Sequence, residues 1–387
     1  MKGKAKGKSG GALRGRCFPA VVRARGAGRN LAQAFAGRRA AQLENGLVRV
    51  SVLVGGGHIA EISLLENGVN PLWIPPWPSL EPAEFDPRVH TTYGVGIESR
   101  LLAGIMGHNL CFDYFGPPSE EEAAAGLGVH GEAPVVDWKI SVESTGSLRA
   151  TAELPLAQMR IERRFKLPRG STVLSIAETA ENLSAVDRAV GWTQHVTLGP
   201  PFVAGGRTVF HLPATRSRVF ESDFAGGKGR LRIGAEFDWP FCPGLDGSSL
   251  DLRQTADVPA SAAYTAHLMD PQREQAWFTA YNPDSRVLFG YVWRRSDFPW
   301  LGSWEENHCR EHKPWNGMGV TRGMEFGVSP MPETRRRMID RGSLFGVPGF
   351  RWIPARSRVT VEYCAFIRRS DRPVTEVEWR GNEVVFS

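Results

Sequence analysis

The sequence predicts an all-β protein built from antiparallel strands. Short apolar runs follow one another through residues 44–387, separated by turns rich in Gly, Ser, Pro and Asn, and no long helical period intervenes. Such regular spacing is typical of a sandwich or a barrel. The 42% apolar and 10% aromatic content supplies a large core. Because no internal repeat or composition break divides this stretch, we expect one large β domain over 44–387.

Residues 1–43 differ sharply from the rest. They hold 11 of the 47 Lys and Arg residues and no Asp or Glu. With so little apolar content to bury, the segment is predicted to be a disordered basic tail. It lacks the apolar core of a secretory signal. An organellar transit peptide, which the high Gly content fits poorly, and a basic arm for nucleic acid are the alternatives.

The composition of the remainder excludes several classes of protein. Its 36 Lys and Arg residues face 41 Asp and Glu residues, so the folded body is mildly acidic and shows no nucleic-acid footprint. No apolar run reaches the ~18 residues of a membrane span. The five Cys residues are scattered without CxxC spacing, which argues against a disulfide frame or a cysteine zinc site. We therefore expect a cytoplasmic protein without membrane or nucleic-acid partners.

The body opens with a predicted hairpin. Residues 47–54 and 58–65 are β runs joined by Gly55-Gly56-Gly57. Residues 70–118 are irregular and rich in Pro, Trp and Gly, and a long ordered connection of this kind is usually functional or packs as a lid. Residues 120–125 are compatible with a short helix.

The strands predicted after this point come in two series. The first is 137–143, 148–154, 159–167, 172–181 and 188–198. The second is 208–212, 262–269, 275–281, 286–293, 324–328, 357–367 and 374–386.

One stretch in the first series carries a reactive side chain. Residues 191–202 alternate like a strand around His195 and then stop at Gly199-Pro200-Pro201. The imidazole is thereby placed near a sheet end, where it can meet a ligand and exchange a proton near neutral pH. The alternative is a histidine that fills a strand position and bonds a neighbouring carbonyl group.

Several motifs together resemble the galactose mutarotase (aldose 1-epimerase) superfamily. The resemblance starts at Glu44 and covers nearly all of the body. Its motifs are the hairpin Val52 to Leu65, Gly128-Val129-His130-Gly131 before Trp138, Gln194-His195-Val196, residues 276–291, and Gly323 to Pro330 around Glu325. Each motif is short, and their order and spacing carry the resemblance. It implies a large antiparallel β-supersandwich.

The resemblance also implies roles for individual residues. Glu325 is expected to act as the base that takes the proton of the anomeric hydroxyl group, and His195 as the acid that protonates the ring oxygen. His130 and Arg100 are expected to hold sugar hydroxyl groups and developing charge. Without the resemblance, Glu325 reads as an ordinary carboxylate on a surface strand.

The sequence departs from the family pattern in two places. The Tyr-Phe-Asn-Leu that usually follows the second histidine is replaced by residues 197–200, Thr-Leu-Gly-Pro. The family's substrate-binding Asp has no clean counterpart. His267 and Asp270 lie nearest in sequence, and Asp251 is a further candidate.

Two more sets of residues are candidates for the site. Trp300, Trp304 and Trp315 crowd one segment before Glu325, and aromatic faces stack on the C–H faces of sugars, so Trp300 and Trp304 are expected substrate contacts. His308 and His312 are spaced like helical metal ligands, with Glu305 nearby. The HExxH glutamate is missing, however, and Lys313-Pro314 would end a helix, so a loop lining a sugar cleft is preferred.

The sequence therefore predicts an enzyme that interconverts the anomers of a monosaccharide or sugar derivative, without metal or cofactor. Two alternatives remain open. One is a catalytically silent carbohydrate-binding protein on the same scaffold, and the other is a different sugar-active enzyme, such as a lyase or hydrolase, which needs a second carboxylate or a Tyr/His pair.

Overall fold

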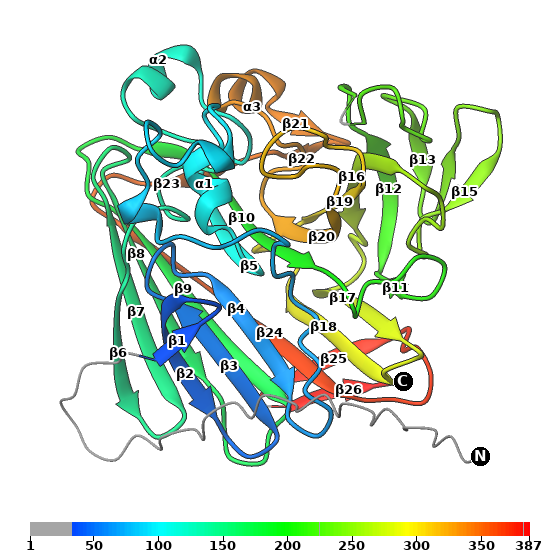
Figure 1. The fold of residues 1–387 in the computed structure, drawn as a ribbon, viewed down its shortest axis with the longest axis horizontal. Helices are drawn as coiled ribbons and strands as arrows, with labels where there is room; N and C mark the ends of the chain where they lie inside the picture. Colours follow the sequence, from blue (N-terminus) through cyan, green and yellow to red (C-terminus); the bar gives the residue numbers. More distant parts are fainter. Residues whose placement is uncertain (1–32, 224, 382) are drawn as a thin grey trace, which may run out of the picture. The chain divides into compact units, whose positions relative to one another are not determined.

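Two large antiparallel sheets organise the structure, a computed structural model that describes residues 33–223, 225–381 and 383–387 (Figure 1). Within these residues one sheet has 12 strands and the other eight, which confirms the predicted all-β class. The described residues form one compact unit.

The larger sheet runs in the order β1 (Gln33–Phe35), β2 (Arg38–Glu44), β3 (Val48–Leu53), β4 (Ile59–Leu64), β5 (His108–Asp113), β10 (Arg188–Leu198), β20 (Val320–Gly327), β19 (Trp300–Asn307), β16 (Ser261–Met269), β12 (Ala214–Val219) and β13 (Glu236–Asp238), with β23 (Arg351–Ile353) paired to β10. The smaller sheet runs β11 (Val209–His211), β17 (Gln275–Asn282), β18 (Val287–Arg294), β24 (Arg358–Arg369), β9 (Val173–Asn182), β8 (Met159–Lys166), β7 (Ser147–Leu154) and β6 (Lys139–Ser144).

The main core lies between the two sheets. The rings of Phe326 on β20 and Trp293 on β18 stack with centroids 4.2 Å apart, and Tyr363 on β24 meets Phe326 edge-on at 5.4 Å. All of these residues are fully buried. Aromatic residues of this size bury large apolar areas, so this contact fixes which face of β20 turns inward.

A polar network is sealed inside the same core. The carboxamide oxygen of Gln194 on β10 accepts from Arg163 Nη2 at 2.8 Å and from the Tyr363 hydroxyl at 3.0 Å, and it lies 2.9 Å from His108 Nε2. Gln194 Nε2 donates to Glu178 at 2.7 Å, and Arg163 pairs with the same carboxylate. These five side chains have no accessible surface, and buried polar groups are costly unless bonded. The network therefore holds β10 in one orientation at the residue before His195.

The first two strands, β1 and β2, show that the predicted N-terminal tail extends too far along the sequence. Residues 33–43, expected in the tail, form strands, whereas residues 1–32 lie outside the described part. Ala40 and Ala41 are fully buried. The Arg38 guanidinium, also buried, donates to the carbonyl oxygens of Gly104 and Gly55 at 2.8 and 2.9 Å and pairs with Glu81 at 3.2 Å. A basic residue of the supposed tail is thus an internal ion-pair partner.

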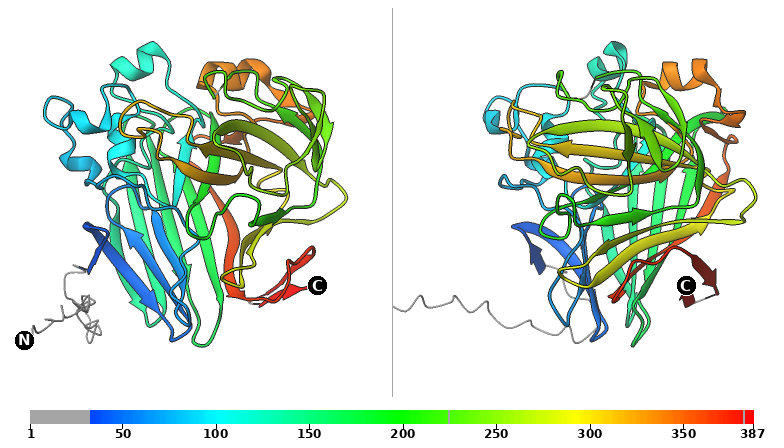
Figure 2. Two further views of the ribbon diagram at one scale, coloured as in Figure 1. Left: turned by 45° about the vertical axis from the view of Figure 1, so that its right-hand side comes forward. Right: turned by 90° about the vertical axis from the view of Figure 1, so that its right-hand side faces the viewer.

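Long connections and short helices surround one end of the sheets (Figure 2). The helices are η1 (Pro82–Glu84), η2 (Thr91–Tyr93), α1 (Ser99–Gly104), α2 (Glu120–Ala124) and α3 (Arg335–Arg341), and the small two-stranded sheets are β14 (Phe241–Pro243) with β15 (Ser249–Asp251), β21 (Ser343–Leu344) with β22 (Val347–Pro348), and β25 (Val377–Arg380) with β26 (Glu383–Phe386). Ser119 and Glu122 form a capping box that starts α2, where the sequence predicted a short helix.

The connections cover the outer face of the larger sheet with tryptophans. Trp73 stacks on Trp315 with centroids 5.6 Å apart, and Trp77 meets Trp315 edge-on at 4.9 Å. Trp315 also contacts Trp304 of β19 at 6.0 Å. Trp73 and Trp77 of the predicted irregular segment 70–118 thus pack on Trp315, which contacts β19, whereas residues 108–113 of that segment form β5 within the sheet.

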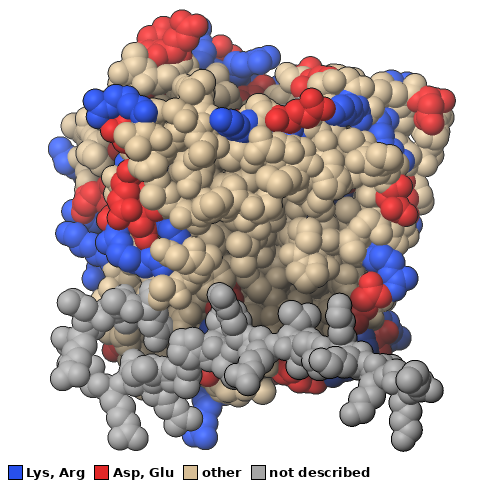
Figure 3. Space-filling view, viewed as in Figure 1, with Lys and Arg blue, Asp and Glu red and all other residues tan. Residues whose placement is uncertain are grey.

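Charged residues gather mainly toward the margins of the face seen in Figure 3, and both signs are interspersed there. The centre of that face carries few charges. Among the described residues, no helix combines the length and the apolar character that crossing a bilayer requires.

Candidate functional site

The candidate site is a single row of side chains across the larger sheet. His195 on β10 is the direct cross-strand partner of Glu325 on β20, and on its other side of Asn109 on β5. Glu325 in turn pairs with Gly302 of β19. Side chains at paired positions share a face of the sheet, so the row brings together residues far apart in the sequence.

The imidazole of His195 faces the carboxyl group of Glu325. His195 Nε2 lies 3.2 Å from Glu325 Oε1, and the other ring nitrogen lies 3.0 Å from the Thr197 hydroxyl. Only 5% of His195 and 2% of Glu325 is exposed. The predicted acid and base are therefore in contact and shielded from water.

Burial shifts both groups toward their neutral forms. Burial raises the pKa of Glu325 well above its ordinary value. Burial, with a smaller contribution from His130, lowers the pKa of His195 well below its ordinary value. Both shifts favour a protonated carboxyl group beside a neutral imidazole; the two groups lie 3.2 Å apart, and Glu325 Oε1 has no hydrogen-bond partner within the described residues.

Gly323 makes room for the carboxyl group. A Cβ at this position would lie 2.3 Å from Glu325 Oε1 and 3.0 Å from Trp304 Cβ. Any side chain at position 323 would therefore collide with the carboxyl group as it is now placed.

His130 completes the imidazole cluster. Its ring centroid lies 5.0 Å from that of His195, and its Nδ1 donates to the carbonyl oxygen of Phe115 at 2.5 Å. The backbone is left-handed here, with φ of 69°. Burial, opposed by the Phe115 contact and reinforced by Arg310, lowers the pKa of His130 to about 4. At neutral pH Nε2 is therefore an unprotonated acceptor, suited to a hydroxyl group.

Trp304 and Arg310 lie beside the pair. The Trp304 ring lies 5.9 Å from that of His195, and the Arg310 guanidinium sits over Trp304 and Trp315 at 5.4 and 5.0 Å. Arg310 also pairs with Glu306 at 3.5 Å. The cation–π contacts hold a positive charge at the margin of an otherwise apolar cover.

Two residues that lie beside His195 and His130 were not predicted from the sequence: Asn109 and Arg310. Asn109 is fully buried, and its amide nitrogen has no hydrogen-bond partner within the described residues. Arg310 takes the place near the imidazoles that the sequence suggested for Arg100. A buried amide without a partner is a signal of a polar ligand, but only the register of β5 against β10 shows that Asn109 adjoins His195.

Other predicted site residues lie elsewhere. Arg100 is exposed on α1 and donates to the carbonyl oxygen of Pro82 at 2.9 Å. Asp270 follows β16, where it pairs with Arg273 at 3.5 Å. Asp251 pairs with Arg253 at 2.7 Å. The structure does not bring these three side chains to the row.

His267 lies on the opposite face of the larger sheet from the candidate site. On β16, Tyr264 and Ala266 are the partners of Trp304 and Gly302, so His267 points to the opposite face. It is fully buried there, with Nδ1 2.8 Å from the Ser217 hydroxyl. Trp300 shares the face of Trp304, but it is fully buried and donates to the carbonyl oxygen of Pro348 at 3.1 Å.

The possible metal ligands do not converge. The segment that carries them is irregular beyond β19, not helical. His308 Nδ1 donates to the carbonyl oxygen of Gly317 at 2.6 Å, whereas His312 Nε2 lies 3.3 Å from Glu98. Across the ranges that the structure describes, no group of His, Cys, Asp and Glu side chains is placed to hold a metal ion.

Comparison with known proteins gives a likeness in structure alone. No family model matches the chain. No curated protein matches its sequence. Among solved structures, it resembles a proposed aldose 1-epimerase from Klebsiella pneumoniae, with a TM-score of 0.59 and 13% identity over 84% of this chain and 77% of the other.

Two further structures give the same result. A galactose mutarotase-like protein from Clostridium acetobutylicum matches with a TM-score of 0.56 and 13% identity over 87% of this chain and 98% of the other. One from Lactobacillus casei matches with a TM-score of 0.53 and 13% identity over 85% and 100%. The sheets, their order and these likenesses agree: the chain has the galactose mutarotase-like fold.

Proposed function

We propose that this protein interconverts the anomers of a monosaccharide or sugar derivative by general acid–base catalysis. The observation that carries the proposal is the contact between His195 and Glu325, two titratable groups with opposite pKa shifts on adjacent strands. Anomer interconversion requires one group to accept the proton of the anomeric hydroxyl group and one to protonate the ring oxygen. These two oxygens share one carbon, so two adjacent side chains can address both.

The protonated carboxyl group beside a neutral imidazole suits this chemistry. When the hydroxyl groups of a sugar replace apolar cover, the charged forms are better solvated, and transfer of the Glu325 proton to His195 yields a carboxylate and an imidazolium. The carboxylate then takes the anomeric proton while the imidazolium protonates the ring oxygen. The ring opens, rotation about C1–C2 exposes the other carbonyl face, and the transfers reverse on closure.

The surrounding residues supply binding in this proposal. His130 accepts a sugar hydroxyl group at Nε2, Asn109 donates its free amide hydrogens, and Trp304 offers a ring face. Because His195 and Glu325 are nearly inaccessible, the sugar enters only when the tryptophan-bearing connections move away.

Polarimetry tests the proposal directly. The wild-type protein is expected to accelerate the change in optical rotation of a freshly dissolved α-anomer from a panel of aldoses. Glu325→Gln and His195→Asn should each reduce the rate by about 10²–10⁴-fold, since each removes one proton-transfer group. Asp270→Asn is the matched control and should keep the rate. Full activity of either site variant would contradict the assignment of roles.

The deep burial of the pair also favours a second candidate function, a catalytically silent carbohydrate-binding protein. Here the His195–Glu325 contact would be structural, and Trp304 with Arg310 would supply the binding surface. A wild-type protein that binds an aldose, seen by tryptophan fluorescence, without accelerating mutarotation of any sugar would establish this function and exclude the enzyme.

A further inference from the structure

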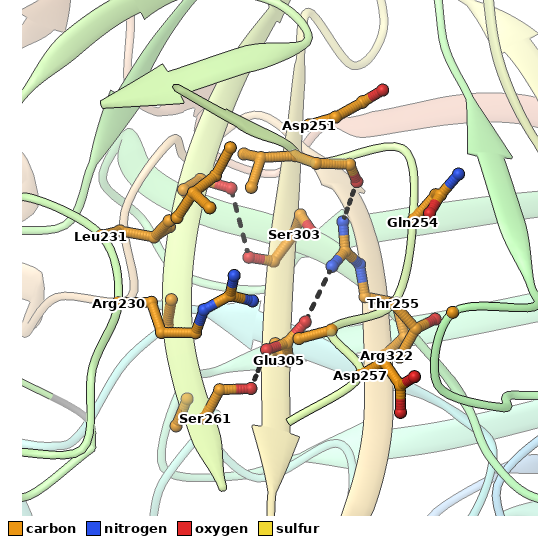
Figure 4. A pocket seen from close by; sticks show the side chains of 17 residues that line it. Arg230, Leu231, Asp251, Gln254, Thr255, Asp257, Ser261, Ser303, Glu305 and Arg322 are labelled. Carbon is orange, nitrogen blue, oxygen red and sulfur yellow. Dashed lines mark hydrogen bonds and ion pairs between the residues drawn. The ribbon is translucent and has the colours of Figure 1, made fainter. Parts of the chain in front are cut away.

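A second polar pocket lies on the opposite face of the sheet from the His195–Glu325 row. It is a cavity of about 260 Å³ whose floor is formed by β16, β19 and β20 and whose walls come from residues 230–231 and 250–257 (Figure 4). Arg322 lines it, three residues before Glu325 on β20. Successive side chains of a strand alternate between faces, so these two side chains project in opposite directions.

The floor of the pocket is not built like the rest of that face. Toward the middle of the sheet the same face presents Leu301, Met324 and Phe326, all fully buried. At the pocket the corresponding positions are occupied by Ser303, Glu305 and Arg322. Small and charged side chains thus replace apolar core residues where the cavity opens. A position that served only to pack the protein interior would carry an apolar side chain.

The charged pair in the floor is bonded at every group except Arg322 Nε, which is buried without a hydrogen-bond partner within the described residues. Arg322 Nη1 lies 3.3 Å from Glu305 Oε2, Arg322 Nη2 donates to the carbonyl oxygen of Leu252 at 2.8 Å, and the Ser261 hydroxyl donates to the other Glu305 oxygen. The two side chains are only 4% and 13% exposed. The floor is therefore close to electrically neutral.

Arg230 adds a positive charge that has no ion-pair partner among the described residues, although Asp246 lies close enough to interact with it and the wall also carries Asp257. It is half-buried, and Figure 4 shows its guanidinium pointing into the pocket, toward Ser303 and Glu305. Neither an ion pair nor a side-chain hydrogen bond joins this guanidinium to any other residue that the structure describes. The Thr255 hydroxyl in the pocket wall is also buried without a partner among those residues. A guanidinium facing a polar hollow offers a fork of donors to an anionic group.

We propose that this pocket binds a small hydroxylated organic anion. Its carboxylate or phosphate group pairs with Arg230, and its hydroxyl groups bond to the exposed side chains of Gln254 and Asp257 at the rim. The volume is near the lower end of small-molecule sites, ~300 Å³, and suits a ligand about the size of a monosaccharide. The site shares no residue with the His195–Glu325 row, so the proposal stands independently of the proposed function.

Titration calorimetry on the full chain tests this site. Gluconate and glycerol 3-phosphate are the anionic probes, and sorbitol and glycerol are their uncharged counterparts. At least one anion is expected to bind, and which one binds distinguishes a carboxylate ligand from a phosphate ligand. Loss of a charge-assisted contact of about 1.5–3 kcal/mol predicts that Arg230→Gln raises Kd by roughly 10–100-fold.

Three further variants make the result specific. Arg232→Gln removes the same charge from an exposed residue outside the pocket and should change Kd less than about twofold, given the screening of exposed charges. Ala263→Leu fills the floor without changing charge and should weaken binding. Glu325→Gln should leave anion binding intact. Circular dichroism checks that each variant folds.

The proposal is overturned if neither anion binds, if the uncharged counterparts bind equally well, or if Arg230→Gln and Arg232→Gln weaken binding to the same extent. Loss of anion binding in Glu325→Gln would place the ligand at the other site and would also overturn it. Failure of mutarotation assays has no bearing on these outcomes.

Discussion

His195 and Glu325 are 130 positions apart in the sequence and yet are direct cross-strand partners, with Nε2 and Oε1 3.2 Å apart. Because both are buried, their neutral forms are favoured, with the proton on the carboxyl group. This relationship has a thermodynamic signature apart from any activity.

We expect the stability of the wild-type protein relative to Glu325→Gln to fall as pH rises above 4.5, the ordinary pKa of Glu. Below that pH the carboxyl group is protonated in both folded and unfolded chains. Above it the unfolded chain releases the proton while the folded chain retains it, so the folded state loses up to about 1.4 kcal/mol per pH unit until the raised pKa is passed. Urea unfolding of both proteins from pH 4.5 to 7.5 measures the difference.

His195 contributes in the opposite direction. Its lowered pKa means that stability is lost as pH falls below 6.5, where the unfolded imidazole gains a proton. This contribution is present in both proteins and largely cancels from their difference. A relative stability that stayed flat or rose with pH would show that the folded pair is ionised, contrary to the assignment made above.

Gly323→Ala should reduce activity more than it reduces stability. The new methyl group would lie 2.3 Å from the end of the Glu325 side chain, which can swing away, and 3.0 Å from the less mobile Trp304 Cβ. We expect a stability loss of about 1–3 kcal/mol and, because the carboxyl group leaves its place, at least a ~10-fold loss of mutarotation. Gly96→Ala, where a methyl group meets open space, is the control in both assays. Equal, small effects of the two substitutions would contradict this account.

Arg163→Met should destabilise the protein by about 3–5 kcal/mol, since it leaves the Glu178 carboxylate charged and unpaired in the core. Adding Glu178→Gln removes that charge while keeping an acceptor for the amide of Gln194, and should restore on the order of 1–3 kcal/mol. Chemical denaturation of the wild type, both single variants and the double variant forms the cycle. A double variant less stable than Arg163→Met would refute the argument.

Arg38→Ala should cost about 3–5 kcal/mol, because it strands the Glu81 carboxylate beneath β2. Arg39→Ala removes the same charge one residue later, from a side chain that is 52% exposed, and should cost less than about 1 kcal/mol. Denaturant midpoints separate the two. Similar values would mean that β2 is held by its backbone alone.

Some strands of the larger sheet could be predicted from the sequence and others could not. The hairpin of β3 and β4 was predicted because a Gly loop joins two clear β runs. Strand β4 is buried at every residue and was marked by the Gly loop before it, whereas β5 and β19, which flank the central pair of strands, are almost as buried, mix polar and apolar residues and were missed. A strand covered on both faces shows no alternation of polar and apolar residues.

The residues of the candidate site could likewise be predicted only in part. The resemblance located His195, Glu325 and His130 from spacing, and the structure gathers them. Arg100 was expected from the role that the resemblance implies, and His267 and Asp270 were chosen for proximity in sequence. Neither determines the face or the strand end to which a side chain belongs. A shift of one residue reverses the face, as His267 and its neighbour Ala266 illustrate.

Strand β20 carries Glu325 on one face and Arg322 on the other, three residues apart, and both side chains are almost completely buried. A ligand that moved Arg322 would have to move backbone shared with Glu325, because close-packed strands do not deform locally. Only a ligand with that effect would link binding at the two faces, and such linkage is reciprocal: the factor by which it changes sugar affinity is the factor by which the sugar changes its affinity. With such linkage, the response of the protein to each solute would depend on how much of the other was bound.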